Sequence, residues 1–153
     1  DYDIPEHHLD DILDLLTVAS TDAVYGDLNT EPINWTRERL AEAHSRLRAR
    51  KSHTLLIAVE EEGRIVALTE LARHHDADPE VCEWTLTVTA RDRRRVGLAT
   101  SAKLHALHEV AQWWPDTRRA YCSVADADPA MNRIYQHLGA EVISTSSAWE
   151  LKL

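Results

Sequence analysis

The chain has 153 residues, the size of one domain, and we expect residues 1–153 to fold as a single unit. Its 26 acidic and 17 basic residues give a net charge of −9, which argues against nucleic acid as a partner because phosphate binding requires a basic face. No apolar stretch approaches the roughly 18 residues that span a bilayer, and no signal peptide is visible. We therefore predict a cytoplasmic protein that binds no membrane, with Cys82 and Cys122 as buried free thiols.

The first third of the chain has the spacing of amphipathic helices. Residues 6 to about 19 place apolar side chains at three- and four-residue steps after Pro5, which predicts a helix. Residues 21–28 break this pattern and predict a loop. A second, strongly charged helix is predicted from residue 34 or 36 to residue 50.

The period then changes to the two-residue alternation that is typical of strands. Two apolar runs, residues 54–60 and 65–71, flank a turn at Gly63 and predict a hairpin. Residues 81–89 alternate cleanly and predict a third strand. Its two faces are expected to be polar and apolar respectively: Glu83, Thr85, Thr87 and Thr89 on one, and Trp84, Leu86 and Val88 on the other.

The rest of the chain alternates helices with strands. We predict helices over residues 97–113 and 129–138, and strands over residues 119–124 and 141–151. The resulting order, ααβββαβαβ, predicts an α/β fold (α+β by some schemes) in which a mixed central sheet has helices on both faces.

The segment between the third strand and the next helix carries the strongest signal for chemistry. Four arginines crowd this segment of an acidic chain: Arg91, Arg93, Arg94 and Arg95. The start of a helix offers unpaired N–H groups and the positive end of the helix dipole, which together bind anions. Gly97 lets a ligand approach the backbone closely, and the small Ala99 keeps the first turn uncrowded. These features predict a cradle for a diphosphate; a solvated loop is the alternative reading of the charge alone.

The pattern Arg94-x-x-Gly97-x-Ala99 resembles the acetyl-CoA pyrophosphate loop of the GNAT N-acetyltransferase superfamily, Gln/Arg-x-x-Gly-x-Gly/Ala. The flanks agree with this resemblance: a strand precedes the loop, and a helix with Lys103 follows it. Residues 131–139 resemble the helix of the family that ends in Tyr-x-x-Leu-Gly-Phe, and the order of elements is similar over nearly the whole chain. Gly26-Asp27-Leu28 and Trp35…Glu38-Arg39 more softly resemble actinobacterial-type GNATs, some of which contain two such domains in tandem.

The resemblance implies how acetyl-CoA would bind. The strand at residues 81–89 would splay from the strand at 119–124, in a mostly antiparallel sheet, and the thioester arm would lie in the gap. The amide near Thr87 would then face the thioester carbonyl and stabilise the tetrahedral intermediate by roughly 3–4 kcal/mol. Asp128 stands where the family often has Asn. The implied cofactor contacts are Thr87, Val88, Thr89, Arg94, Arg95, Val96, Gly97, Leu98, Ala99, Thr100, Asp128 and Tyr135.

The resemblance also suggests catalytic groups. An alkylammonium acceptor must lose a proton before it can attack, and Glu83, eleven residues before Arg94, is our candidate general base, with Glu70 as its rival. A structural ion pair is the alternative role for Glu83. Tyr135 matches the family tyrosine that protonates the departing thiolate, and a core aromatic is its alternative.

Taken together, these residues predict an acetyl-CoA-dependent N-acetyltransferase. It would acetylate a primary amine of a small-molecule or protein acceptor by direct attack in a ternary complex, and the acidic charge favours a cationic acceptor. Homodimers are frequent in this superfamily, so a dimer is one expectation. A non-catalytic acyl-CoA-binding module, as half of a tandem protein, and an unrelated phosphate-binding α/β domain are the other hypotheses. The nine histidines fix no third metal ligand by their spacing, so we predict no metal site.

Overall fold

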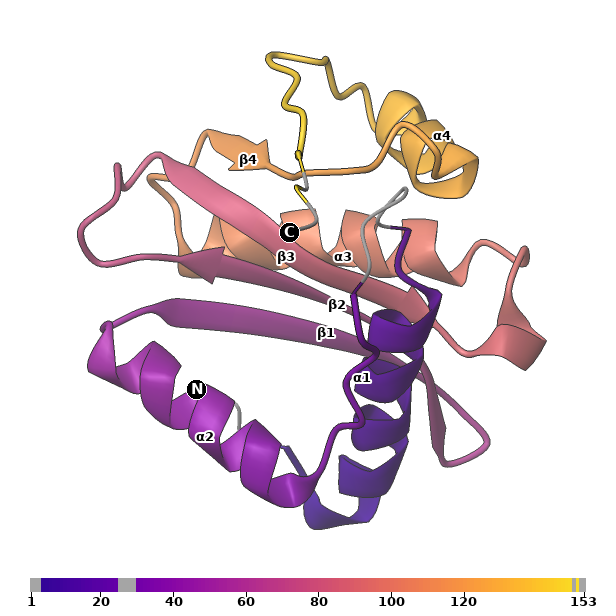
Figure 1. The fold of residues 1–153 in the computed structure, drawn as a ribbon. Helices are drawn as coiled ribbons and strands as arrows, with labels where there is room; N and C mark the ends of the chain where they lie inside the picture. The colour runs from indigo at the N-terminus through magenta and orange to yellow at the C-terminus, as the bar shows by residue number, and fades with distance from the viewer. Residues whose placement is uncertain (1–3, 25–29, 150, 152–153) are drawn as a thin grey trace.

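Three antiparallel strands and one short parallel strand form the central sheet of the protein, seen here in a computed structural model that describes residues 4–24, 30–149 and 151 (Figure 1). The strands, in the spatial order β1-β2-β3-β4, are β1 (His53–Glu61), β2 (Arg64–Arg73), β3 (Val81–Thr89) and β4 (Arg119–Tyr121). The helices are α1 (Leu9–Asp22), α2 (Arg37–Ala49), α3 (Leu98–Trp113) and α4 (Pro129–His137), with short 3-10 turns at Glu6–His8 and Arg91–Arg93. The predicted fold class is confirmed. Gly26, Asp27 and Leu28, which carry part of the softer resemblance, lie outside the described residues.

The two N-terminal helices form where the apolar spacing predicts them. Helix α1 buries a stripe of four residues: Ile12, Leu13, Leu15 and Leu16. Helix α2 begins after Thr36, whose hydroxyl accepts a hydrogen bond from the amide of Arg39 at 3.3 Å and so caps the helix. Its only buried residue is Leu40, because the rest of this charged helix lies on the surface.

The core consists of two apolar clusters, one on each face of the sheet. On one face, α1 and Leu40 of α2 pack against Leu68 of β2 and Val88 of β3. On the other face, Ala106 and Val110 of α3 pack with Leu71 of β2. Figure 1 shows this layering, with α1 and α2 in front of the sheet and α3 behind it. Strand β2 therefore lies at the centre of the fold and is buried along nearly its whole length.

A β-bulge in β3 overturns the predicted division of its two faces. Glu70 of β2 pairs with Leu86, but the next residue of β2, Leu71, pairs with Trp84, so Thr85 is an extra residue in β3. Because an extra residue reverses the alternation of side chains, Trp84 packs with the α3 cluster whereas Leu86 packs with the α1 cluster. The prediction that they share one face was wrong.

The C-terminal part of the predicted sheet does not form. Strand β4 ends at Tyr121 rather than at residue 124, and residues 141–149 contain no strand. Val142 and Ile143 of this predicted strand are 84% and 70% exposed. Strand propensity depends on side chains that pack against a neighbouring strand, and the three-residue β4 offers only a short edge for pairing. The serine- and threonine-rich run at residues 144–147 also has no apolar face to bury.

Candidate functional site

Strands β3 and β4 pair over only three residues and then part. The parallel register joins Val81 to Arg119, Cys82 to Ala120 and Glu83 to Tyr121. After Tyr121 the chain leaves the sheet and leads to α4 (Figure 1). From Trp84 to Thr89, the edge of β3 that faces away from β2 pairs with no other strand among the described residues. The splayed strands implied by the resemblance are thus present.

The backbone of β3 directs free amide groups toward this opening. Ala90, directly after β3, donates its amide to the carbonyl of Val66 on β2 at 2.8 Å. Consecutive strand residues direct their N–H and C=O groups to opposite edges, so Thr89 and Thr87 direct theirs away from β2. The carbonyl of Thr89 accepts a hydrogen bond from Nε of Arg94 at 3.2 Å, which agrees with this orientation. Val88 instead points its amide toward β2 and its side chain into the core.

The loop after β3 ends in an uncapped helix start. Gly97 precedes α3 with a left-handed φ of 89°, and no side chain hydrogen-bonds to the first turn as a cap. The first amides of a helix have no intrahelical acceptor, so those of Leu98, Ala99 and Thr100 are available to an anion. A Cβ built on Gly97 meets no atom within 4 Å, which means that the space above this residue is open. Val96 beside it is 64% exposed.

Asp22, at the end of α1, anchors two of the four loop arginines. Its carboxylate accepts hydrogen bonds from Arg91 at 2.6 and 3.0 Å and from Arg94 at 2.5 Å. The hydrogen bond from Arg91 is the main reason why the pKa of Asp22 falls to about 2. The Arg94 guanidinium, expected to bind a ligand phosphate, therefore already has a carboxylate partner. Arg95 has a left-handed φ of 67° and no ion pair with any residue that the structure describes.

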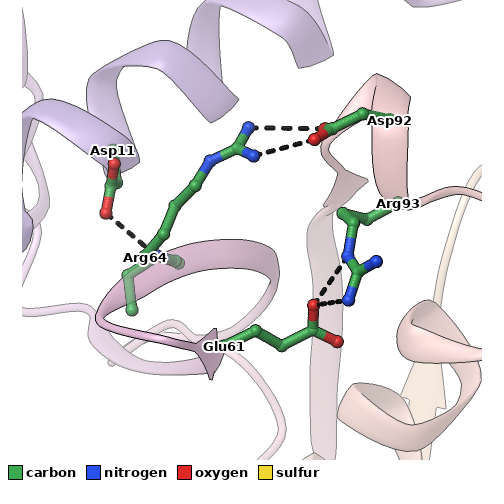
Figure 2. Close-up of polar contacts among 6 residues, drawn as sticks. Asp11, Glu61, Arg64, Asp92 and Arg93 are labelled. Atoms are coloured by element: carbon green, nitrogen blue, oxygen red, sulfur yellow. Dashed lines mark hydrogen bonds and ion pairs between the residues drawn. The ribbon is translucent and has the colours of Figure 1, made fainter.

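A second set of ion pairs ties the same loop to the β1–β2 hairpin. Figure 2 shows Arg93 paired with Glu61 at the end of β1, and Arg64 at the start of β2 paired with Asp92 at 2.9 and 3.4 Å. Asp11 of α1 accepts the amide of Ile65 at 2.9 Å beside them. The loop is thus held from three elements. A local motif cannot predict the residues that pair with the loop, because they lie 28 to 72 residues away in the sequence.

The two candidate bases lie in different environments. Glu83 is the last residue of β3 that pairs with β4, its side chain is 52% exposed, and Nε2 of His74 lies 3.9 Å from its carboxylate. Glu70 of β2 is only 8% exposed, and its carboxylate accepts a hydrogen bond from the hydroxyl of Thr85, the bulge residue. Burial raises the pKa of Glu70, and the hydrogen bond from Thr85 opposes this rise.

Tyr135 lies beside the point where the strands part. Its ring contacts that of Trp84 edge-on, with centroids 6.1 Å apart. Its hydroxyl oxygen accepts a hydrogen bond from Nζ of Lys103 on α3 at 3.0 Å. Burial and the neighbouring Cys122 thiol both raise the pKa of Tyr135. From the sequence, Lys103 is identified only as a residue of the helix that follows the loop. Its spacing in the sequence does not predict that this lysine has no exposed surface.

Asp128 caps the helix that carries Tyr135. Its Oδ1 accepts the amide of Met131 at 3.0 Å, and its own carbonyl accepts Nδ2 of Asn132 at 2.8 Å. Both contacts stabilise the start of α4. The carboxylate that replaces the family's usual Asn is thus engaged within the protein.

Comparison with known proteins decides the family. Residues 21–140 match the sequence model of the acetyltransferase (GNAT) family. The chain belongs to the GNAT family. Members of this family are acetyltransferases that use acetyl-CoA, so acetyl transfer is the general activity that its membership supports. No curated protein matches the sequence.

Solved structures of acetyltransferases share this GNAT fold at low sequence identity. The apo aminoglycoside 6'-N-acetyltransferase AAC(6')-Ig of Acinetobacter haemolyticus has a TM-score of 0.65 and 15% identity, over 98% of this chain and 96% of that one. The ribosomal-protein-alanine N-acetyltransferase of Brucella melitensis has a TM-score of 0.68 and 13% identity, over 89% and 80%. A tandem GNAT protein of the clavulanic acid biosynthesis pathway has a TM-score of 0.67 and 18% identity, over 89% of this chain and 38% of that one.

The GNAT fold brings most of the predicted site residues to one region. Thr87, Thr89 and the loop through Gly97 follow one another along the open edge of β3, and Tyr135 lies at its closed end. Glu83 marks the position where pairing stops. Within the described ranges, no helix is long and apolar enough to cross a membrane.

Proposed function

We propose that residues 1–153 form one catalytic domain that transfers the acetyl group of acetyl-CoA to a primary amine. The amine attacks the thioester directly, with both substrates bound at once. The observation that carries the proposal is the opening between β3 and β4, with free amides of Thr87 and Thr89 along its edge and an uncapped helix start at its end. This combination offers donors both to an extended amide-containing arm and to a diphosphate.

The cofactor contacts divide between backbone and side chains. The amides of Leu98, Ala99 and Thr100 hold the diphosphate, and Gly97 leaves room for it because the space above it is open. Arg94 contributes through its backbone, since its guanidinium binds Asp22, whereas Arg95 is free to contribute its charge. The amides of Thr87 and Thr89 bind the arm, and that of Thr87 stabilises the oxyanion.

The general base is one of two carboxylates. Glu83 satisfies the spacing to the loop, but its side chain is half exposed. Glu70 is buried, and its raised pKa makes it a stronger base toward an alkylammonium at neutral pH. We therefore favour Glu70 and keep Glu83 as the competing assignment. Tyr135 donates its proton to the thiolate that leaves, because burial keeps the phenol protonated.

The acceptor class follows from charge rather than from fold. The structural neighbours include acetyltransferases named for an aminoglycoside and for a ribosomal-protein alanine, so the shared fold accommodates dissimilar amines. The net charge of −9 favours a cationic acceptor, such as a polyamine or an aminosugar, by long-range attraction.

The direct test combines calorimetry with a turnover assay. Acetyl-CoA is titrated into the protein, and the release of free CoA is then measured with a panel of amines at neutral pH. We expect binding of acetyl-CoA and release of CoA that depends on an amine. Absence of any binding would refute the proposal. Binding without turnover on every amine would favour a non-catalytic module, the second candidate, which the similarity to part of a tandem protein supports.

A further inference from the structure

Lys103 is a lysine with no exposed surface and no carboxylate partner among the described residues. Its Nζ lies 4.1 Å from the ring centroid of Trp84 and 4.5 Å from that of Tyr135. The same atom donates the 3.0 Å hydrogen bond to the Tyr135 hydroxyl. A buried ammonium is costly unless it is compensated, and here two aromatic faces and one phenolic oxygen provide the compensation. Such an arrangement is expensive for a purely structural side chain, which suggests that it has a chemical role.

The hydrogen bond has a consequence for the phenol. Because the Tyr135 oxygen accepts from Nζ, its own O–H points away from Lys103, and the Cys122 thiol is its hydrogen-bond partner when no ligand is bound. After the phenol gives up that proton, a phenolate remains in a partly buried place, and burial disfavours the charge. Nζ lies 3.0 Å from the phenolic oxygen, so it is able to stabilise the phenolate and return a proton to it.

We infer that Lys103 is the positioning residue of Tyr135, orienting its O–H toward the departing sulfur and reprotonating the phenolate after each turnover. This inference rests on the proposed acetyl transfer. When the C–S bond breaks, its electron pair stays on sulfur, which takes the phenolic proton and becomes the thiol. A proton then passes from the Nζ ammonium to the phenolate, and the resulting neutral amine takes a proton from water before the next turnover.

The surroundings of Lys103 suit this exchange. The groups that face Nζ are the neutral indole of Trp84 from β3, the phenol of Tyr135 from α4 and the Cys122 thiol from the segment after β4. Burial lowers the pKa of Lys103 to about 7, and the Cys122 thiol opposes this fall. Both forms of the amine are therefore populated near neutral pH, as proton return requires.

The test is a double-mutant cycle between Lys103→Met and Tyr135→Phe, with Lys51→Met as the matched exchange at an exposed lysine. We expect Lys103→Met to lower kcat about tenfold or more with the KM for acetyl-CoA nearly unchanged. In the Tyr135→Phe background, Lys103→Met should lower kcat less than twofold, because the hydroxyl through which Lys103 acts is absent. If Lys103→Met lowers kcat by the same factor in the wild type and in Tyr135→Phe, the inference is overturned, since a packing role would give that result.

The pH profile gives a second readout. The active form carries the ammonium, so wild-type kcat should fall as the pH rises through the pKa of Lys103, and Lys103→Met should lose this alkaline limb. An identical limb in the variant overturns the inference.

A third readout needs neither turnover nor a folded variant. Titration of the Lys103 ε-methylene NMR signals in the unliganded wild type should give a pKa near neutrality, and a value near that of a free lysine overturns the inference. If the wild type acetylates no amine, the proposed function itself fails, which is a separate outcome.

Discussion

Substitution of Gly97 separates the proposed ligand-binding role of the loop from its contribution to stability. Gly97 and Gly63 have nearly equal left-handed φ values, 89° and 81°, and a Cβ at either position meets no atom within 4 Å. A side chain at such a φ costs about 1–2 kcal/mol per residue, and a β-branched valine lies at the upper end. Gly97→Val and Gly63→Val should therefore lower the free energy of unfolding equally, which corresponds to a fall in Tm of about 2–8 °C.

The two variants should differ only in ligand binding. In Gly97→Val the isopropyl group occupies the open space before the uncapped amides of α3, whereas Gly63 lies in the β1–β2 turn and not at the start of a helix. Loss of two hydrogen bonds to a charged diphosphate, at about 1.5–3 kcal/mol each, weakens binding by at least about 100-fold. Calorimetry with acetyl-CoA measures this loss. If Gly97→Val bound acetyl-CoA as tightly as Gly63→Val, the assignment of the diphosphate to this loop would be wrong.

Four further substitutions test the remaining assignments. Glu70→Gln should lower kcat about 100-fold at neutral pH while Glu83→Gln changes it little; the reverse order would return the base to Glu83. Because the pKa of Glu70 is raised, its contribution to stability is lost as the pH rises through that pKa, so Glu70→Gln should raise Tm at pH 8 more than at pH 4. Tyr135→Phe should lower kcat about 100-fold with the affinity for acetyl-CoA retained, and an unchanged kcat would leave it a packing role. Asp22→Asn should lower Tm at pH 7 and much less at pH 2, since most of the stabilisation by a carboxylate with a lowered pKa is lost as the pH falls from about 4 to 2; a Tm difference as large at pH 2 as at pH 7 would contradict the ion-pair account.

The local periodicity of the sequence was sufficient to predict most of the helices and strands. Residues 81–89 alternate without interruption, and β3 spans the predicted residues. Helix α2 starts one residue after Thr36, the later of its two predicted starts, and α3 starts directly after Gly97. In each of these places the signal is a backbone preference or an apolar stripe that a few neighbouring residues determine.

Features that depend on a partner strand could not be predicted. The bulge at Thr85 depends on how β3 aligns with β2, and it moves Trp84 to the α3 face, where it contacts Lys103 and Tyr135. The alternation of residues 81–89 contains no sign of this shift. For residues 141–149 the local propensity favoured a strand, but the structure shows none, and the neighbouring β4 is only three residues long.

The arginine loop shows what a short motif does and does not determine. Arg94 and Gly97 match the family pattern, and the backbone follows it, with a left-handed glycine before an uncapped helix. The Arg94 side chain, however, binds Asp22, 72 residues earlier in the sequence, and so fixes the loop to α1. A motif defined by residue spacing constrains the nearby backbone, whereas the partner of a long, flexible side chain depends on which distant carboxylate the fold brings within reach. Arg94 therefore contributes to the rigidity of the loop, whereas in the proposed function the positive charge toward the ligand comes from Arg95. The sequence predicted the backbone of this loop but not the partner of the Arg94 side chain.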